Sequence, residues 1–214
     1  METFEKTSLN QVKRVPKRGH YDKDTVYGIL DAACVGHVGF SMNDQPFVIP
    51  TIYGRDQDTL YFHGATTSRM LVQLQKGMPV CMTVTHVDGL ILARSAFHHS
   101  MNYRSAVVFG TARLVEDTDK LHALEVISEQ ILKGRWSEVR QPSEKELKAT
   151  SVVALEIEQA SAKVRTGPPV DDAEDYELPI WAGILPIHQA YGQPIEDPDS
   201  RRPLAVPQSV RRIL

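Results

Sequence analysis

The chain has 214 residues and a formal net charge of −3, with 42% hydrophobic and 24% charged residues. This length suits one large or two small domains, and the composition is ordinary for a soluble globular protein. The small negative charge excludes the broad basic field of a nucleic-acid-binding protein. No apolar run approaches the roughly 18 residues of a spanning helix, and the N-terminus lacks a signal-peptide core. We therefore expect a cytoplasmic protein with no membrane span and no nucleic-acid partner.

The first part of the chain predicts a basic arm, two helices and three strands. Residues 1–23 are polar and basic, and Asp24 is placed to cap a helix that runs to about residue 33. Gly77 suits the end of the second helix. The strands are expected at 34–40, 47–53 and 59–63, and the second helix within 64–75.

The second part predicts further strands and two helices before the character of the chain changes. Asp88-Gly89 is a strong hairpin signal between strands at 80–86 and 90–97. A long strand at 103–115 has a possible bend at Gly110, and an amphipathic helix follows from Asp117 or the next residue. Ser143 and Glu146 fit a capping box for a short helix. The last strands are expected at 152–157 and 162–166.

Short antiparallel hairpins with a few helices predict a mainly β, α+β protein built as an antiparallel barrel or sandwich. The absence of βαβ alternation and of a Gly-rich dinucleotide fingerprint argues against a Rossmann domain. We expect a basic N-terminal arm at 1–23, a central domain at 24–166 and a proline-rich wrapping segment at 167–214, where prolines break regular elements.

The segment from His63 to Arg69 is the first candidate site. It joins a strand to a helix and offers three hydroxyls, the N–H groups of the coming helix and one guanidinium, which suit a phosphate. The alternative is a helix cap by Thr67 or Ser68 beside a solvated Arg69.

A second candidate is the end of an apolar strand at Ile49, Pro50 and Thr51, whose backbone groups can face a planar heterocycle. An ordinary edge strand explains the same residues, since proline favours edges, ends or bulges.

A third candidate is the polar run from His98 to Ser105, because polar groups near a core must be satisfied or must bind something. Adjacent histidines on a strand point to opposite faces, so His98 and His99 do not chelate one ion easily. The two cysteines, Cys34 and Cys81, lie far apart in apolar contexts and are interpreted as buried hydrophobes. These patterns disfavour a metal site.

Two further candidates lie towards the C-terminus. Lys163 and Arg165 place two cations on one strand face, either in solvent or near an anion. Trp181 can cover a hydrophobic patch, close a site or contact another subunit.

The order of these motifs resembles the flavin-nucleotide-binding branch of the pyridoxamine 5′-phosphate oxidase-like superfamily, close to the nitroimidazole-reductase-like proteins. The resemblance spans about residues 12–190 and rests on Ile49-Pro50-Thr51, Tyr61-Phe62-His63-Gly64, Ser68-Arg69, Asp88-Gly89-Leu90, the run from Ser100 to Ser105, Ala162-Lys163-Val164-Arg165 and Trp181-Ala182-Gly183. It implies an FMN-binding split barrel and a homodimer with FMN at the subunit interface. The C-terminal substrate-binding pattern of true pyridoxamine-phosphate oxidases is not matched.

Residue by residue, the resemblance implies FMN phosphate contacts from Ser68 and Arg69 with His63 beside them. It also implies that Ile49, Pro50 and Thr51 line the isoalloxazine, that the strand carrying Asn102, Tyr103 and Arg104 approaches the flavin, and that Lys163, Arg165 and Trp181 form a rim. The structural alternative for Arg104 is an ion pair with a nearby carboxylate such as Glu116 or Asp117.

The resemblance leads to an FMN-dependent oxidoreductase that reduces a small planar acceptor, with nitroreductase-like chemistry and NADH or NADPH as a possible reductant. Two alternatives stay open. One is a non-catalytic flavin carrier or sensor, and the other is a split barrel that binds haem through a histidine.

Overall fold

The computed structural model describes residues 2–214, which fold into two compact units that interleave along the sequence. Unit 1 comprises the residues up to Ala32 together with Cys81–Phe109 and Glu158–His188. Unit 2 comprises Ala33–Val80, Gly110–Ile157 and Gln189–Leu214. Among the described residues, no helix has both the length and the apolar character needed to span a membrane.

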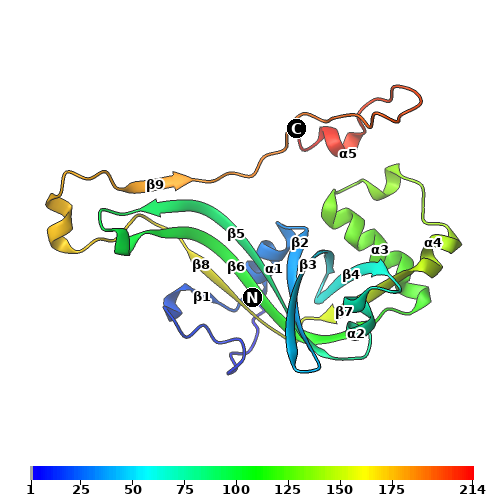
Figure 1. The fold of residues 1–214 in the computed structure, drawn as a ribbon, viewed down its shortest axis with the longest axis horizontal. Helices are drawn as coiled ribbons and strands as arrows, with labels where there is room; N and C mark the ends of the chain where they lie inside the picture. Colours follow the sequence, from blue (N-terminus) through cyan, green and yellow to red (C-terminus); the bar gives the residue numbers. More distant parts are fainter. Residues whose placement is uncertain (1) are drawn as a thin grey trace. The chain divides into compact units, whose positions relative to one another are not determined.

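Unit 1 is built on antiparallel strands (Figure 1). Strand β8 pairs on one side with β1 and on the other with β6, and β9 pairs with β5. Its elements are η1 (Pro16–Arg18), β1 (Gly19–His20), α1 (Lys23–Asp31), η2 (Ala96–His98), β8 (Gln159–Arg165), η4 (Ala173–Glu177) and β9 (Gly183–Pro186), with parts of the long strands β5 (Pro79–Leu92) and β6 (Ser100–Leu114).

Helix α1 forms where the sequence predicts it, but the expected cap at Asp24 is wrong. Asp22 occupies the N-cap, and its carboxylate accepts a hydrogen bond from the Thr25 N–H at 2.8 Å. Asp24 instead lies in the first turn, where a negative charge complements the positive end of the helix dipole. Val26, Ile29 and Leu30 form the buried face.

The expected hairpin turn at Asp88-Gly89 is also wrong, because β5 runs through both residues without turning. A two-residue type I′ turn needs a positive φ at both central positions, and neither residue has one. A Cβ on Gly89 would lie 3.1 Å from the backbone oxygen of Leu185, so glycine here admits the neighbouring strand β9. The chain turns later, around η2, and the proline-rich segment contributes β9 as an edge strand.

Unit 2 holds a second antiparallel arrangement in which β3 pairs with β2 and β4, and β7 pairs with β4 and with the end of β6. Asn43 and Asp44, both with positive φ, form the turn between β2 and β3. The elements of this unit are β2 (Val35–Met42), β3 (Gln45–Asp56), β4 (Thr59–Ala65), α2 (Arg69–Leu74), α3 (Asp117–Ile131), η3 (Trp136–Glu138), α4 (Glu144–Ala149), β7 (Thr150–Glu156) and α5 (Gln208–Arg211).

Helix α3 lies directly on strand β3 at Gly54. A Cβ at this position would be 2.6 Å from both the N and the Cα of Ile127, closer than real contacts allow. The buried cluster behind this contact comprises Val115, Ala123, Val152 and Ala154, with Tyr61 and Leu124 packed against it. Backbone packing at Gly54 therefore sets how closely α3 covers the sheet.

The capping box predicted for α4 is confirmed. The Ser143 hydroxyl accepts from the Glu146 N–H while the Glu146 carboxylate accepts from the Ser143 N–H, which completes the capping box of α4. Gly110 lies where a Cβ would meet the Glu156 oxygen at 1.9 Å. Cys34 and Cys81, expected to be buried, are only half-buried.

We predict that Gly54→Ala lowers the free energy of unfolding by about 3 kcal/mol, at the upper end of the range for overpacked cores, because the helix backbone itself must move. The matched control is Gly28→Ala in α1, where a Cβ would meet nothing within 4 Å. This control should be neutral or stabilising by up to about 1 kcal/mol. Urea denaturation of both variants measures the difference, and equal stabilities would contradict the contact.

Candidate functional site

Strand β3 has one paired edge and one open edge over its first half. The Tyr53 N–H donates to the Cys34 oxygen at 3.1 Å, towards β2, so by strand alternation Ile49 and Thr51 also direct their backbone groups to β2. Val48 and Pro50 direct theirs to the other edge, where the pairing with β4 covers only Tyr53 to Asp56. Pro50 therefore lies where no neighbouring strand requires a hydrogen bond from its backbone nitrogen.

The start of helix α2 approaches the face of β3 that carries Ile49 and Thr51. Phe47 shares this face by alternation, stacks on Phe40 with ring centroids 5.5 Å apart, and lies 4.9 Å beneath the guanidinium of Arg69. Ser68 is the N-cap residue, but its side chain makes no capping hydrogen bond. The alternative of a simple cap by this hydroxyl is therefore not realised, and Arg69 is exposed to solvent.

His63 points away from this group. On β4 the neighbouring Gly64 faces α2, because a Cβ there would touch Leu71 at 3.0 Å, so alternation turns the His63 ring to the opposite face. There it lines a cavity of about 280 Å³. The other lining residues are Leu124, Trp136, Arg140, Pro142, Glu146 and Thr150.

The electrostatics of this cavity favour a neutral imidazole. Burial of the ring lowers the pKa of His63, although the residue as a whole is exposed by its surface area. Arg140 donates to both carboxylate oxygens of Glu146, at 2.9 and 2.8 Å, and these bonds with those from Ser143 hold the Glu146 pKa well below its usual range. The cavity thus combines a neutral nitrogen base with an internally neutralised ion pair.

Arg104 in unit 1 forms a bidentate ion pair, but not with either expected carboxylate. Its Nε and Nη2 each donate to Asp88 at 2.9 Å, whereas Glu116 and Asp117 were the expected alternatives. These hydrogen bonds lower the pKa of Asp88 and raise that of Arg104. With side-chain exposures of 40% for Arg104 and 35% for Asp88, the pair contributes about 1 kcal/mol or less to stability.

Asn102 and Arg165 form a buried polar pair. Arg165 Nη1 donates to Asn102 Oδ1 at 2.6 Å, and Asn102 Nδ2 donates to the Gly167 oxygen at 3.2 Å. Each residue is only 8% exposed, and burial lowers the pKa of Arg165. These two predicted site residues therefore satisfy each other inside unit 1.

The remaining predicted site residues are Tyr103, Lys163 and Trp181. Tyr103 and Lys163 are half-buried on the paired strands β6 and β8. Trp181 is 69% exposed, and its ring lies against Gly183, where a Cβ would be 2.9 Å away.

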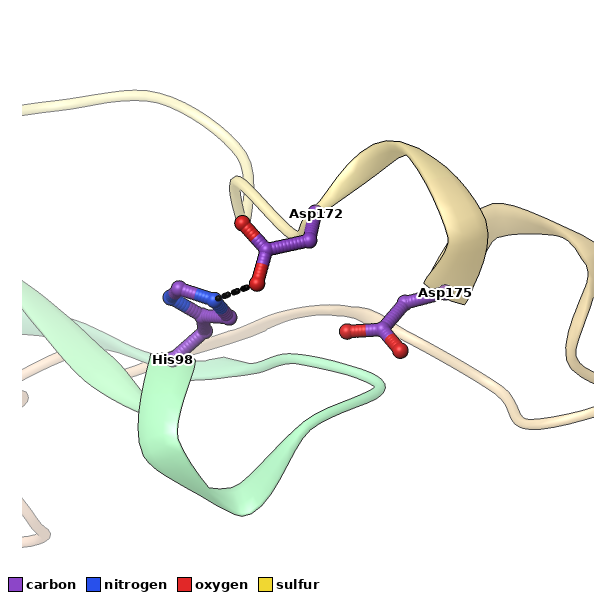
Figure 2. A group of neighbouring side chains, drawn as sticks. All are labelled: His98, Asp172 and Asp175. Carbon is purple, nitrogen blue, oxygen red and sulfur yellow. Dashed lines mark hydrogen bonds and ion pairs between the residues drawn. The ribbon is translucent and has the colours of Figure 1, made fainter.

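One cluster, formed by His98, Asp172 and Asp175, was not predicted from the sequence (Figure 2). His98 belongs to the turn η2 and not to the expected strand, while His99 Nδ1 accepts from the Ala93 N–H at 3.1 Å. The rings of His98 and His99 therefore have different partners, as expected. The density of carboxylates from Asp171 to Asp175 was the available signal, but its histidine lies more than 70 residues earlier.

Comparison with known proteins establishes the family. The profile of the family described as pyridoxamine 5′-phosphate oxidase matches residues 22–164. The chain therefore belongs to the pyridoxamine 5′-phosphate oxidase-like superfamily of split-barrel proteins, as its sequence predicts, and its α+β antiparallel fold is the fold of that superfamily. No curated protein sequence matches the chain.

The solved structures that are similar to this chain include the following three. The flavocytochrome Anf3 from Azotobacter vinelandii is 38% identical, with 97% of each chain covered and a TM-score of 0.90. The FAD and haem binding protein from Mycobacterium smegmatis is 34% identical, with 92% of this chain and 97% of that chain covered and a TM-score of 0.88. A proposed 5-nitroimidazole antibiotic resistance protein from Bacteroides thetaiotaomicron is 26% identical, with 68% and 86% covered and a TM-score of 0.58.

We predict that Asn102→Ala destabilises the cofactor-free protein by about 2–3 kcal/mol, because it leaves a buried guanidinium without its acceptor. Thr166→Ala, at an exposed neighbouring position, is the control and should change stability little. Urea unfolding without added cofactor measures both. If Asn102→Ala were as stable as the parent protein, Asn102 would not be needed for stability and would be available to contact a ligand.

Proposed function

We propose that the protein binds a flavin nucleotide between the open edge of β3 and the start of α2, and serves in electron transfer. The proposal rests on the Arg69 guanidinium, which lies 4.9 Å above the Phe47 ring, and on the neighbouring Ser68 hydroxyl, which makes no capping hydrogen bond. An arginine and a hydroxyl suit a phosphate through charge-assisted hydrogen bonds. The flavocytochrome and the FAD and haem binding protein support the same class of ligand.

The edge of β3 can pair with part of the polar side of an isoalloxazine. The uracil-like edge of a flavin presents an acceptor, a donor and another acceptor; the Val48 N–H and C=O can serve the first two, whereas Pro50 has no N–H for the third. The Val48 and Pro50 carbonyls and the Val48 N–H point to that edge, while Ile49 and Thr51 line the adjoining face. These groups would hold and orient the ring.

A bound flavin would supply hydride or one-electron transfer, and the protein would supply position and exclusion of competing reactions. Reduction of a small planar acceptor by NADH or NADPH is the enzymatic form of the proposal, and a non-catalytic carrier is its alternative. Steady oxidation of NADH or NADPH in the presence of an added nitroaromatic acceptor distinguishes the two. A homodimer with flavin at the subunit interface remains part of the proposal.

We predict that Arg69→Ala weakens flavin binding by about 1.5–3 kcal/mol, the range for hydrogen bonds to charged groups. Lys76→Ala is the matched control, because this exposed cation follows the same helix and is paired with Gln73. Flavin fluorescence titration gives the dissociation constants, and mass analysis of released flavin decides between the predicted FMN and the FAD named for the mycobacterial neighbour. A colourless protein that takes up neither flavin would contradict the proposal.

Haem is a second candidate ligand, and the observation that favours it is the His63 cavity. Because burial lowers the pKa of His63, its imidazole is neutral at pH 7, which is the form that coordinates iron. Leu124, Trp136 and Pro142 provide apolar contacts in this cavity, beside the Arg140–Glu146 ion pair. His63 would hold the haem iron through a ring nitrogen, and bound haem would supply one-electron transfer.

We predict that His63→Ala abolishes the Soret band of haem-reconstituted protein while the flavin content stays unchanged. His122→Ala serves as the control, since this histidine of the same unit is exposed and paired with Asp56. Absorption spectra of both variants, with flavin measured separately after release, test the assignment. A Soret band of parental position and intensity in His63→Ala would exclude this residue as the ligand.

A further inference from the structure

A group of three potential metal ligands lies in unit 1, apart from the residues proposed for flavin and haem. His98 comes from η2, and Asp172 and Asp175 come from the start of η4 (Figure 2). One ligand atom from each side chain lies within 4.8 Å of the other two. Such a spacing allows all three atoms to reach a single cation.

The local backbone explains why the two aspartates converge. Asp172 is the N-cap of η4, and the Asp175 N–H donates to the Asp172 oxygen at 3.0 Å. Residues three apart in a 3₁₀-helix lie on the same side, so both carboxylates face His98. His98 Nε2 lies 3.3 Å from Asp172 Oδ2, and the Phe97 ring packs edge-on against the imidazole with centroids 5.2 Å apart.

A buried carboxylate holds the two segments together next to this cluster. The Asp171 side chain is fully buried and accepts hydrogen bonds from the Arg94 N–H at 3.0 Å, the Ser95 N–H at 3.2 Å and Arg94 Nη1 at 3.3 Å. The guanidinium of Arg94 also lies 4.8 Å over the Tyr176 ring. The ligands are therefore positioned before any ion binds.

The charges of the three side chains are compatible with a bound cation. The Asp175 carboxylate has no side-chain hydrogen bond or ion pair within residues 2–214, although the residue is half-buried. Asp172 has only the imidazole as a side-chain partner in the same part of the chain, and 73% of its side chain is exposed. Two carboxylates beside one imidazole repel each other, and a divalent ion between them would remove that repulsion.

We propose that His98, Asp172 and Asp175 bind one first-row divalent transition cation, with water completing the coordination. One nitrogen and two oxygen donors suit Zn²⁺ or its neighbours, whereas Mg²⁺ prefers an all-oxygen octahedral shell. The bound ion would tie the turn after β5 to the segment after β8, both within unit 1. This inference does not depend on the proposed flavin or haem.

Zinc titration of the tag-free protein tests the site, followed with a competing chromogenic chelator. We expect one Zn²⁺ per chain, and at least about tenfold weaker binding, or 1.4 kcal/mol, in both His98→Ala and Asp175→Asn. Asp175→Asn preserves size and fold, so it keeps the test valid if His98→Ala is unstable. Zn²⁺ should also slow proteolysis within residues 170–178 of the parent protein and leave that of Asp175→Asn unchanged.

The controls remove similar groups outside the cluster. Glu174→Gln removes a neighbouring exposed carboxylate of the same 3₁₀-helix, and His122→Ala removes an exposed histidine of unit 2. Both should bind Zn²⁺ as the parent does. Equal affinity in the parent and Asp175→Asn, or displacement of Zn²⁺ by equimolar Mg²⁺, would overturn the proposal.

Discussion

The backbone of α3 rests on the backbone of β3 at Gly54, where the Ile127 N and Cα come within 2.6 Å of the place a Cβ would occupy. This contact sets the depth at which α3 lies on the sheet of unit 2, and with it the buried cluster around Val152 and Ala154. The same helix contributes Leu124 to the cavity beside His63. A small change in the helix position would therefore alter both the core and the shape of that cavity.

The two units use their polar side chains differently. In unit 1, the pairs Asn102 with Arg165, Arg104 with Asp88 and Arg94 with Asp171 are internal, and they stabilise the strands and turns that carry them. In unit 2, the Ser68 side chain makes no capping bond, Arg69 is exposed over an aromatic ring, and His63, whose pKa is lowered by burial, lines a cavity. The groups best suited to hold a phosphate or a haem iron are those of unit 2.

Membership of the superfamily defines the fold but not the reaction, because one fold supports many functions through different sites. The separation of His63 from Ser68 and Arg69 on opposite faces of β4 is informative here. It divides a single predicted phosphate site into two places with different chemistry. One is a cation and hydroxyl beside an open strand edge, and the other is an imidazole in a cavity that also contains the Arg140–Glu146 ion pair.

The sequence by itself determined the features that depend on neighbouring residues. The capping box at Ser143 and Glu146, most strands and the long helix after β6 follow from local hydrogen bonds and from the period of apolar residues. Only the tertiary structure decided that β5 continues through Gly89, that Arg104 pairs with Asp88, and that Asp172 and Asp175 meet His98. Each of these depends on a strand or turn brought close by the fold. The conformational propensity of a residue gives no information about such a neighbour, because the contact forms only when the fold brings the two segments together.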